Sequence, residues 1–269
     1  MSNQRRPNFL VIVPDQFRRD FVGCWGQMPA RTPNIDRIAA RGVTFTRATT
    51  PSPQCAPARA CLALGSVYDD CGVYDNSDNF DVARDTFYRR LRDEGYDVLT
   101  CGKLDLHKPY KHWGADGTHL LPEIGFTGGI DSEGKLDAVS SYKANGNRPA
   151  GPYMAFLEDN GLAQTHVSDF SHRDKWLDTY PTPLPDYAYS DNWIAEHAVR
   201  LLTERDPETP WYLSVNFTGP HNPQDVTRAM QERWTDVDFP APIGESSVPP
   251  DRLNAIRQNY AAMAENIDL

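Results

Sequence analysis

Residues 50–65 read TPSPQCAPARACLALG, a turn rich in proline and serine that runs directly into good helix formers. This pattern predicts that Cys55 lies where a loop becomes a helix. At a helix start, unpaired backbone N–H groups and the helix dipole favour anionic ligands and stabilise a nucleophile that gains negative charge. Arg59 lies one helical turn on, on the same face as Cys55. The pair suits a tetrahedral oxyanion such as sulfate or phosphate.

A short apolar run, residues 9–13, predicts a strand that is buried on both faces of a parallel sheet. Asp15 and Gln16 follow this strand, at the edge where ligands gather in open α/β sheets. Their carboxylate and amide oxygens are hard ligands of the kind that Ca²⁺ and Mg²⁺ prefer. We predict that both residues bind a metal, with a turn or cap role as the alternative for Asp15.

Helices and strands alternate along the rest of the chain, which predicts an α/β fold with a mostly parallel central sheet and helices on both faces. Helices are predicted over residues 33–42, 86–94, 189–202 and 249–269, and strands over residues 9–13, 43–46, 96–100 and 211–217. In the first helix, Ile35, Ile38 and Ala39 fall on one face and are predicted to pack. Lys103 and His221 follow two of the strands.

Residues 109–185 show weak periodicity and are rich in Gly, Pro, Asn, Asp and aromatic residues. A loop of this length is uncommon unless it forms a lid or a binding insert. We therefore predict one catalytic domain over residues 1–269 that carries a loop-rich insert, over about 109–185, which shapes substrate specificity.

Composition excludes several classes of protein. The formal net charge of −10 and the absence of Lys/Arg runs argue against a nucleic-acid partner. No apolar stretch approaches membrane-spanning length, so no membrane partner is expected. Five cysteines without metal or disulfide spacing, and an N-terminal apolar run too short for a secretory signal, predict a cytoplasmic location. An anionic substrate must then be attracted locally, by Arg59, Lys103 and a bound cation.

Several motifs together resemble those of one enzyme family. CAPARACLALG resembles the signature of the formylglycine-dependent sulfatases, with Leu64 where the family usually has Thr or Ser. PNFLVIVPDQFRRD, TPNIDRIAARGVTF, the GY-x₅-GK of residues 95–103 and FTGPHNP resemble its other conserved segments. The resemblance points to the arylsulfatase and choline-sulfatase branch and implies an alkaline-phosphatase-like fold. It covers almost all of these residues but only the N-terminal half to two-thirds of a typical member, so we expect a C-terminally incomplete domain.

The resemblance implies a nucleophile and a metal site. A formylglycine-generating enzyme would oxidise Cys55 to an aldehyde, and the hydrated aldehyde would attack sulfur. Asp15, Gln16 and the modified Cys55 would bind a divalent cation, with Ca²⁺ favoured over Mg²⁺ or Mn²⁺. Arg59 would hold the hydrated aldehyde, and Lys103 would stabilise charge on the sulfate oxygens. The expected substrate is a small sulfated molecule or a sulfated sugar.

The same resemblance implies the proton-transfer and substrate-binding groups. His221 would protonate the leaving alcohol. Many relatives carry His two residues after the lysine, where this chain has Asp105. We assign the second acid/base role to His107, on the expectation that the segment is extended and that both side chains face one side. Asp105 and Asn76 are predicted to bind substrate.

Three alternatives stay open. An Asp-Gln pair after the first strand also occurs in phosphonate and phosphodiester hydrolases of the same superfamily. The chain could instead be an inactive fragment that serves another polypeptide, because Asp15, Gln16 and a hydroxyl at Cys55 provide fewer than the six or more oxygen ligands that Ca²⁺ takes. A thiol-based redox protein is the third alternative, and the lack of a resolving cysteine pair near Cys55 argues against it.

Overall fold

The structure is a computed structural model in which residues 6–174 and 178–240 are described. The predicted helix over residues 249–269 lies outside this part of the chain. The described residues form two compact units. The first, called the sheet unit below, contains residues 6–13, Thr49–Ala163 and Ser190–Thr218. The second, called the smaller unit, contains the described residues of Pro14–Ala48, Gln164–Tyr189 and 219–240.

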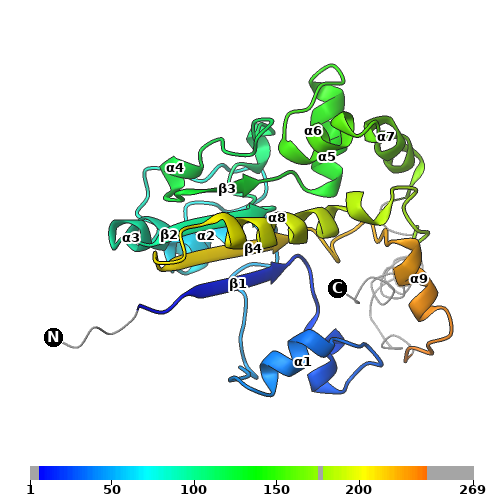
Figure 1. Cartoon of the computed structure of the whole chain (residues 1–269), viewed down its shortest axis with the longest axis horizontal. Coiled ribbons are helices and arrows are strands. Elements are labelled where there is room, and N and C mark those ends of the chain that lie inside the picture. Colours follow the sequence, from blue (N-terminus) through cyan, green and yellow to red (C-terminus); the bar gives the residue numbers. More distant parts are fainter. Residues whose placement is uncertain (1–5, 175–177, 241–269) are drawn as a thin grey trace. The chain divides into compact units, whose positions relative to one another are not determined.

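A four-stranded sheet forms the centre of the sheet unit (Figure 1). Its strands are β1 (Phe9–Pro14), β2 (Asp97–Gly102), β3 (Gly128–Asp131) and β4 (Trp211–Phe217). They lie in the order β1-β4-β2-β3, and β2 pairs in parallel with both β3 and β4. Gly102 stands opposite Asn216, and a Cβ on Gly102 would lie 2.2 Å from the Asn216 carbonyl oxygen. Only glycine fits at this close approach.

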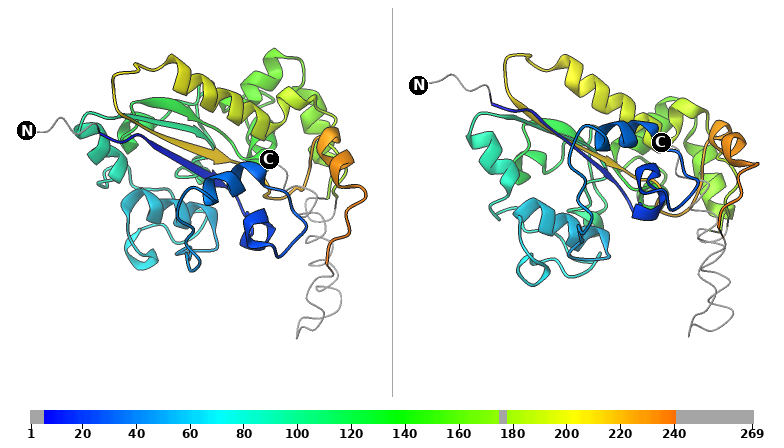
Figure 2. Two further views of the ribbon diagram at one scale, coloured as in Figure 1. Left: turned by 60° about the horizontal axis from the view of Figure 1, so that its bottom comes forward. Right: turned by 90° about the horizontal axis from the view of Figure 1, so that it is seen from below.

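Helices cover both faces of this sheet, as the sequence predicts. Helix α8 (Ser190–Glu204) covers one face, and α2 (Cys55–Leu64) and α3 (Phe87–Asp93) lie on the other (Figure 2). Small residues of α2, such as Ala56 and Ala60, are buried in the core with Val98 of β2. Helix α2 ends at Gly65, which has a φ of 62°, a left-handed conformation that suits glycine.

The first strand is less buried than predicted. Phe9, Leu10 and Ile12 of β1 are 40%, 50% and 50% exposed. The prediction that this strand is buried on both faces is therefore wrong. β1 is the outermost strand beside β4, whereas β4 itself lies between two strands. An apolar run indicates a strand but does not tell a central strand from an edge strand.

In the smaller unit, α1 (Pro33–Ala39) is a helix as predicted, but the strand predicted over residues 43–46 is absent from the structure. Val43 and Phe45 are 81% and 77% exposed, without the partner strand that their alternation requires. The predicted packing face of α1 is also wrong, because none of its residues is buried. Polar contacts hold its first turn instead: Thr32 Oγ1 donates to Asp36 Oδ1 at 2.8 Å.

Residues 109–185 contain more regular structure than the predicted loop-rich insert. They hold β3 and helices α4 (Leu121–Ile124), α5 (Lys135–Ala144), α6 (Pro152–Asp159) and α7 (Ala163–His172). In α5 the buried positions include Lys135 and Ser141 beside Val139. This mixture of polar and apolar buried residues weakens the helical period, which explains why the sequence did not indicate a helix.

The remaining elements are short. They are α9 (Arg228–Trp234) and the 3-10 turns η1 (Arg19–Phe21), η2 (Gly23–Trp25), η3 (Tyr68–Asp70), η4 (Lys108–Tyr110) and η5 (Asp186–Ala188). Among residues 6–174 and 178–240, no helix has the length and apolar character needed to cross a membrane.

Candidate functional site

Cys55 is the first residue of α2, as the sequence predicts. The preceding residue, Gln54, has an extended backbone and does not cap the helix with its own side chain. The cap comes from 20 residues further along: Asn76 Oδ1 accepts from the Ala56 backbone N–H at 3.0 Å, and the Asn76 N–H donates to Gln54 Oε1 at 3.1 Å. Asn76 thus fixes the helix start that carries Cys55. Its predicted contact with substrate stays a prediction.

Lys103 brings a positive charge to Cys55. It follows directly after β2, its side chain is buried, and its Nζ lies 3.7 Å from Cys55 Sγ. The stem of Lys103 passes Gly134, where a Cβ would lie 3.1 Å from Lys103 Cε. An ammonium beside a sulfur at a helix start favours the thiolate and any anion that replaces it.

Arg59 ties α2 to the ends of two strands. Its Nη1 donates to the Lys103 carbonyl oxygen at 2.6 Å and to Asn216 Oδ1 at 3.1 Å. Asn216 is buried in β4, and its Nδ2 donates to Thr100 Oγ1 of β2 at 3.2 Å. Sequence analysis missed Asn216. The signal was present, because an amide in the otherwise apolar strand WYLSVNF needs a hydrogen-bonding partner.

Asp105, rather than His107, contacts Lys103. Asp105 Oδ2 lies 3.1 Å from Lys103 Nζ and 3.3 Å from Lys108 Nζ. The segment is not extended as predicted, because Asp105 has a φ of 57°. Asp is one of the few residues besides glycine that adopt this left-handed conformation readily, and such conformations concentrate at functional sites.

His107 has different surroundings. Burial, followed by the nearby charge of His119, lowers the pKa of His107 to about 4. Its imidazole is therefore neutral at pH 7. The acid/base role of His107 stays a prediction.

Two buried carboxyl groups near this site were not predicted. Asp131 Oδ1 accepts from the Leu104 N–H at 3.0 Å, and burial raises the pKa of Asp131 well above its usual value. Glu133 accepts from the Tyr153 and Met154 N–H groups at 3.1 and 3.2 Å, at the start of α6. Burial raises the pKa of Glu133 to about 7. The run DSEGK after a strand was the available signal, but it lies inside the segment that we predicted to be loop.

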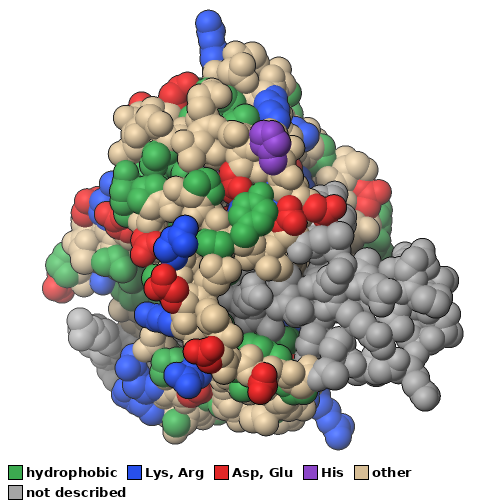
Figure 3. All heavy atoms as spheres, turned by 90° about the vertical axis from the view of Figure 1, so that its right-hand side faces the viewer, with side chains coloured by type: hydrophobic (Ala, Val, Ile, Leu, Met, Phe, Trp, Pro, Cys, Tyr) green, Lys and Arg blue, Asp and Glu red, His purple; other side chains and the backbone are tan. Residues whose placement is uncertain are grey.

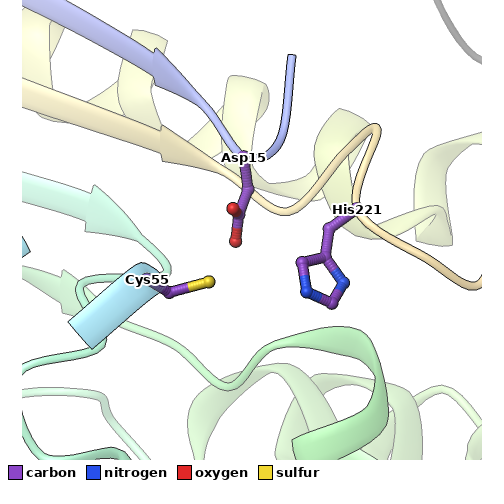
Figure 4. Close-up of side chains that lie close together, drawn as sticks. All are labelled: Asp15, Cys55 and His221. Atoms are coloured by element: carbon purple, nitrogen blue, oxygen red, sulfur yellow. The ribbon is translucent and has the colours of Figure 1, made fainter. Parts of the chain in front are cut away.

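Two of the three predicted metal ligands, Asp15 and Gln16, lie in the smaller unit, and the third, Cys55, lies in the sheet unit. Figure 4 shows Asp15 just after β1, His221 on the loop that follows β4, and Cys55 at the start of α2. A carboxylate oxygen of Asp15 and a ring nitrogen of His221 lie within 4.8 Å of each other. The Asp15 N–H donates to the Gly219 carbonyl at 3.0 Å, which joins the two segments. Gln16 is exposed and has a φ of 63°.

His221 is held by its own loop. Its Nδ1 lies 2.7 Å from the Asn222 carbonyl oxygen, which can only accept a hydrogen bond. Nδ1 therefore carries the proton, and Nε2 is the acceptor nitrogen of the neutral ring. The buried carboxylate of Asp15 fits a divalent cation, because carboxylate oxygens are ordinary ligands of Ca²⁺ and Mg²⁺.

One face of the molecule carries side chains of both charges. Acidic and basic side chains are interspersed on the face of the molecule in Figure 3. With a formal net charge of −10, the chain as a whole repels anions, so any local attraction for an anion at Cys55 would come from nearby cations such as Lys103.

Comparison with known proteins identifies the family of the chain. The family model described as Sulfatase matches residues 7–268. The chain is 36% identical over 250 residues to the Uncharacterized sulfatase YidJ of Escherichia coli K12, covering 90% of this chain and 44% of that protein. It is 24% identical over 253 residues to an Arylsulfatase of Clostridium perfringens, covering 88% of this chain and 48% of that protein.

A solved structure shares the fold. The phosphonate monoester hydrolase of Agrobacterium radiobacter matches with a TM-score of 0.69 and 23% identity, covering 97% of this chain and 57% of that one. The chain spans about half the length of the curated relatives that it matches. The family model covers nearly all of the chain, and the chain therefore belongs to the sulfatase family.

Proposed function

We propose that this chain provides the nucleophile region of a sulfuric ester hydrolase that cleaves a sulfate monoester. One observation carries the proposal: Cys55 of the sulfatase signature lies at the start of α2 with the buried ammonium of Lys103 3.7 Å from its sulfur. A helix start and an ammonium together stabilise negative charge that develops on sulfate oxygens.

Oxidation of Cys55 by a formylglycine-generating enzyme would complete the nucleophile. The hydrated aldehyde supplies one hydroxyl that attacks sulfur and a second whose loss of a proton releases sulfate and restores the aldehyde. Lys103 stabilises the sulfate oxygens, and Arg59 orients the hydrate. Arg59 also donates to the backbone carbonyl of Lys103 just after β2. One side chain would therefore help to position both the hydrate and Lys103.

A divalent cation, Ca²⁺ by preference, would be held by Asp15, Gln16 and the modified Cys55, and it would offset the charge of substrate. As an imidazolium, His221 would protonate the leaving alcohol through Nε2–H, because its Nδ1–H donates to the Asn222 carbonyl. His107 and Asp105 are the candidates for the second proton transfer. The proposed substrate is a small sulfated molecule or a sulfated sugar.

The test compares two substrates. Protein co-produced with a formylglycine-generating enzyme is assayed with Ca²⁺ on an aryl sulfate and on the matching aryl phosphodiester. Faster turnover of the sulfate supports the proposal. Faster turnover of the diester would support the phosphonate and phosphodiester alternative, which Asp15-Gln16 favours. An unmodified Cys55 together with no Ca²⁺ binding would instead support a fragment that serves another polypeptide.

A further inference from the structure

Four charged side chains form a line that starts at Cys55. Lys103 Nζ lies 3.7 Å from Cys55 Sγ and 3.1 Å from Asp105 Oδ2. The same oxygen of Asp105 lies 3.3 Å from Lys108 Nζ, and that ammonium lies 3.3 Å from Asp137 Oδ2. The sign of the charge thus alternates at each step. All of these residues belong to the sheet unit.

These ion pairs are buried or half-buried, so the electrostatic interaction between their charges is stronger than in surface ion pairs. The side chains of Lys103 and Asp105 are 3% and 1% exposed, and those of Lys108 and Asp137 are 18% and 16% exposed. Charges in such surroundings are poorly screened by water and salt. A carboxylate 3.1 Å from Lys103 would by itself neutralise much of the positive field that Lys103 projects toward Cys55.

Lys108 changes this balance because it binds the same oxygen of Asp105. With its charge shared between two ammonium groups, Asp105 can hold Lys103 in position without cancelling its charge. Asp137 acts in the opposite direction, because it competes with Asp105 for Lys108.

We propose that Lys108 is a positioning residue that acts through Asp105 to keep the positive charge of Lys103 available to an anion at Cys55. Asp137 sets how strongly Lys108 does so. Neither residue was among the predicted site residues, and neither is in contact with Cys55 in the described structure.

The test uses two alkylating reagents on protein whose Cys55 is still a thiol, made without a formylglycine-generating enzyme. With iodoacetate or iodoacetamide, the thiolate forms a carbon–sulfur bond and iodide leaves. Iodoacetate is an anion and iodoacetamide is neutral, and both react with the thiolate. The ratio of the iodoacetate rate to the iodoacetamide rate at one cysteine therefore does not depend on the fraction of that cysteine present as thiolate. This ratio reports the local electrostatic field. Mass spectrometry of the Cys55 peptide gives this ratio, and the exposed Cys24 serves as an internal reference.

Wild-type Cys55 is expected to favour iodoacetate more than Cys24 does. Lys108→Gln should lower the Cys55 ratio about threefold, the size expected for a partly buried charge. Lys111→Gln is the matched control, because Lys111 is exposed and its Nζ contacts only Ser140 Oγ among the contacts described. It should leave the ratio unchanged.

The sign of the second variant separates charge sharing from a purely structural role. Asp137→Asn should raise the Cys55 ratio, and the double variant should lie between the two single variants. A loss of packing would lower the ratio in both single variants, and circular dichroism checks that each is folded. The proposal is overturned if Lys108→Gln behaves like Lys111→Gln, or if Asp137→Asn also lowers the ratio.

The consequence for turnover rests on the proposed function. Lys108→Gln should raise KM for an aryl sulfate about threefold, in line with the alkylation ratio. If the ratio changes as expected but the protein hydrolyses no sulfate ester, the role of Lys108 is supported and the proposed function fails. If sulfate is hydrolysed and the ratio does not change, the proposed function stands and the role of Lys108 fails.

Discussion

Cys55 in the sheet unit and His221 in the smaller unit are held by different kinds of contact. Around Cys55 the contacts come from side chains: Asn76 caps the helix start, and Lys103 places its ammonium by the sulfur. His221 is held by the carbonyl of its neighbour Asn222. Substitutions of these side chains around Cys55 should therefore change both electrostatics and local stability, whereas the hydrogen bond between His221 and the Asn222 carbonyl depends on no second side chain.

The largest effect is expected at the nucleophile. Cys55→Ala should lower sulfatase turnover by at least about 10³-fold, because the reaction loses its attacking group. Turnover of an aryl sulfate by the co-produced variant checks this. Cys24→Ala, at an exposed cysteine, should retain wild-type turnover. If Cys55→Ala were as active as the wild type, the proposal that the sheet unit provides the nucleophile would be contradicted.

The next effect is expected at the ammonium beside Cys55. Lys103→Met keeps the length of the buried side chain but removes its charge, so kcat/KM for an aryl sulfate should fall about 10²–10³-fold. Steady-state kinetics measure the loss, with the exposed Lys111→Met as the matched control. A change below tenfold would mean that Lys103 serves packing rather than transition-state stabilisation.

A third effect tests the smaller unit. Asp15→Asn should weaken Ca²⁺ binding at least about tenfold, because an amide oxygen is a poorer ligand than a carboxylate. Isothermal titration with Ca²⁺ measures this, and the exposed Asp236→Asn should bind like the wild type. Equal affinity in Asp15→Asn would place the cation elsewhere.

A fourth effect concerns pH and the buried Glu133. Its pKa of about 7 in the folded protein is above the value of 4.5 for an unperturbed glutamate, so the folded state binds the proton more tightly. The resulting stabilisation is complete below pH 4.5 and is lost as pH rises through 7. Relative to Glu133→Gln, the free energy of unfolding of the wild type should fall by on the order of 2–3 kcal/mol between pH 4.5 and 8. Urea unfolding across this range measures it, and parallel curves would contradict the raised pKa.

The smallest effect is expected at the cap of α2. Asn76→Ala removes the acceptor for the Ala56 N–H and should lower the free energy of unfolding by about 1 kcal/mol. Thermal denaturation should show Tm lower by about 2–4 °C. Asn79→Ala, at an exposed residue of the same loop, is the control. If Asn76→Ala and Asn79→Ala have the same Tm, Asn76 does not cap the helix.

Local patterns predicted the elements that carry the site. The loop-to-helix transition at Cys55 and the strands before Lys103 and His221 are present, because turn residues and apolar runs act over short distances. The edge position of β1 was not predictable in this way, since the order of strands depends on contacts between distant segments.

The side-chain contacts of the site were harder to predict. The direction of His107 relative to Asp105 depends on the left-handed backbone of Asp105, which no periodic pattern indicates. Lys108 and Asp137 meet through a helix that follows β3, and that helix lies in the segment predicted to be loop. Asn216 contacts Arg59 across 157 residues of sequence. Such contacts follow from tertiary structure rather than from spacing.

The most direct measurement is mass spectrometry of the Cys55 peptide from protein co-produced with a formylglycine-generating enzyme, read before and after trapping with a hydrazine reagent. The expected result is an aldehyde at position 55 that forms a hydrazone, together with intact thiols at the four other cysteines. A peptide that retains its thiol at Cys55 and does not react with hydrazine would contradict the proposed nucleophile.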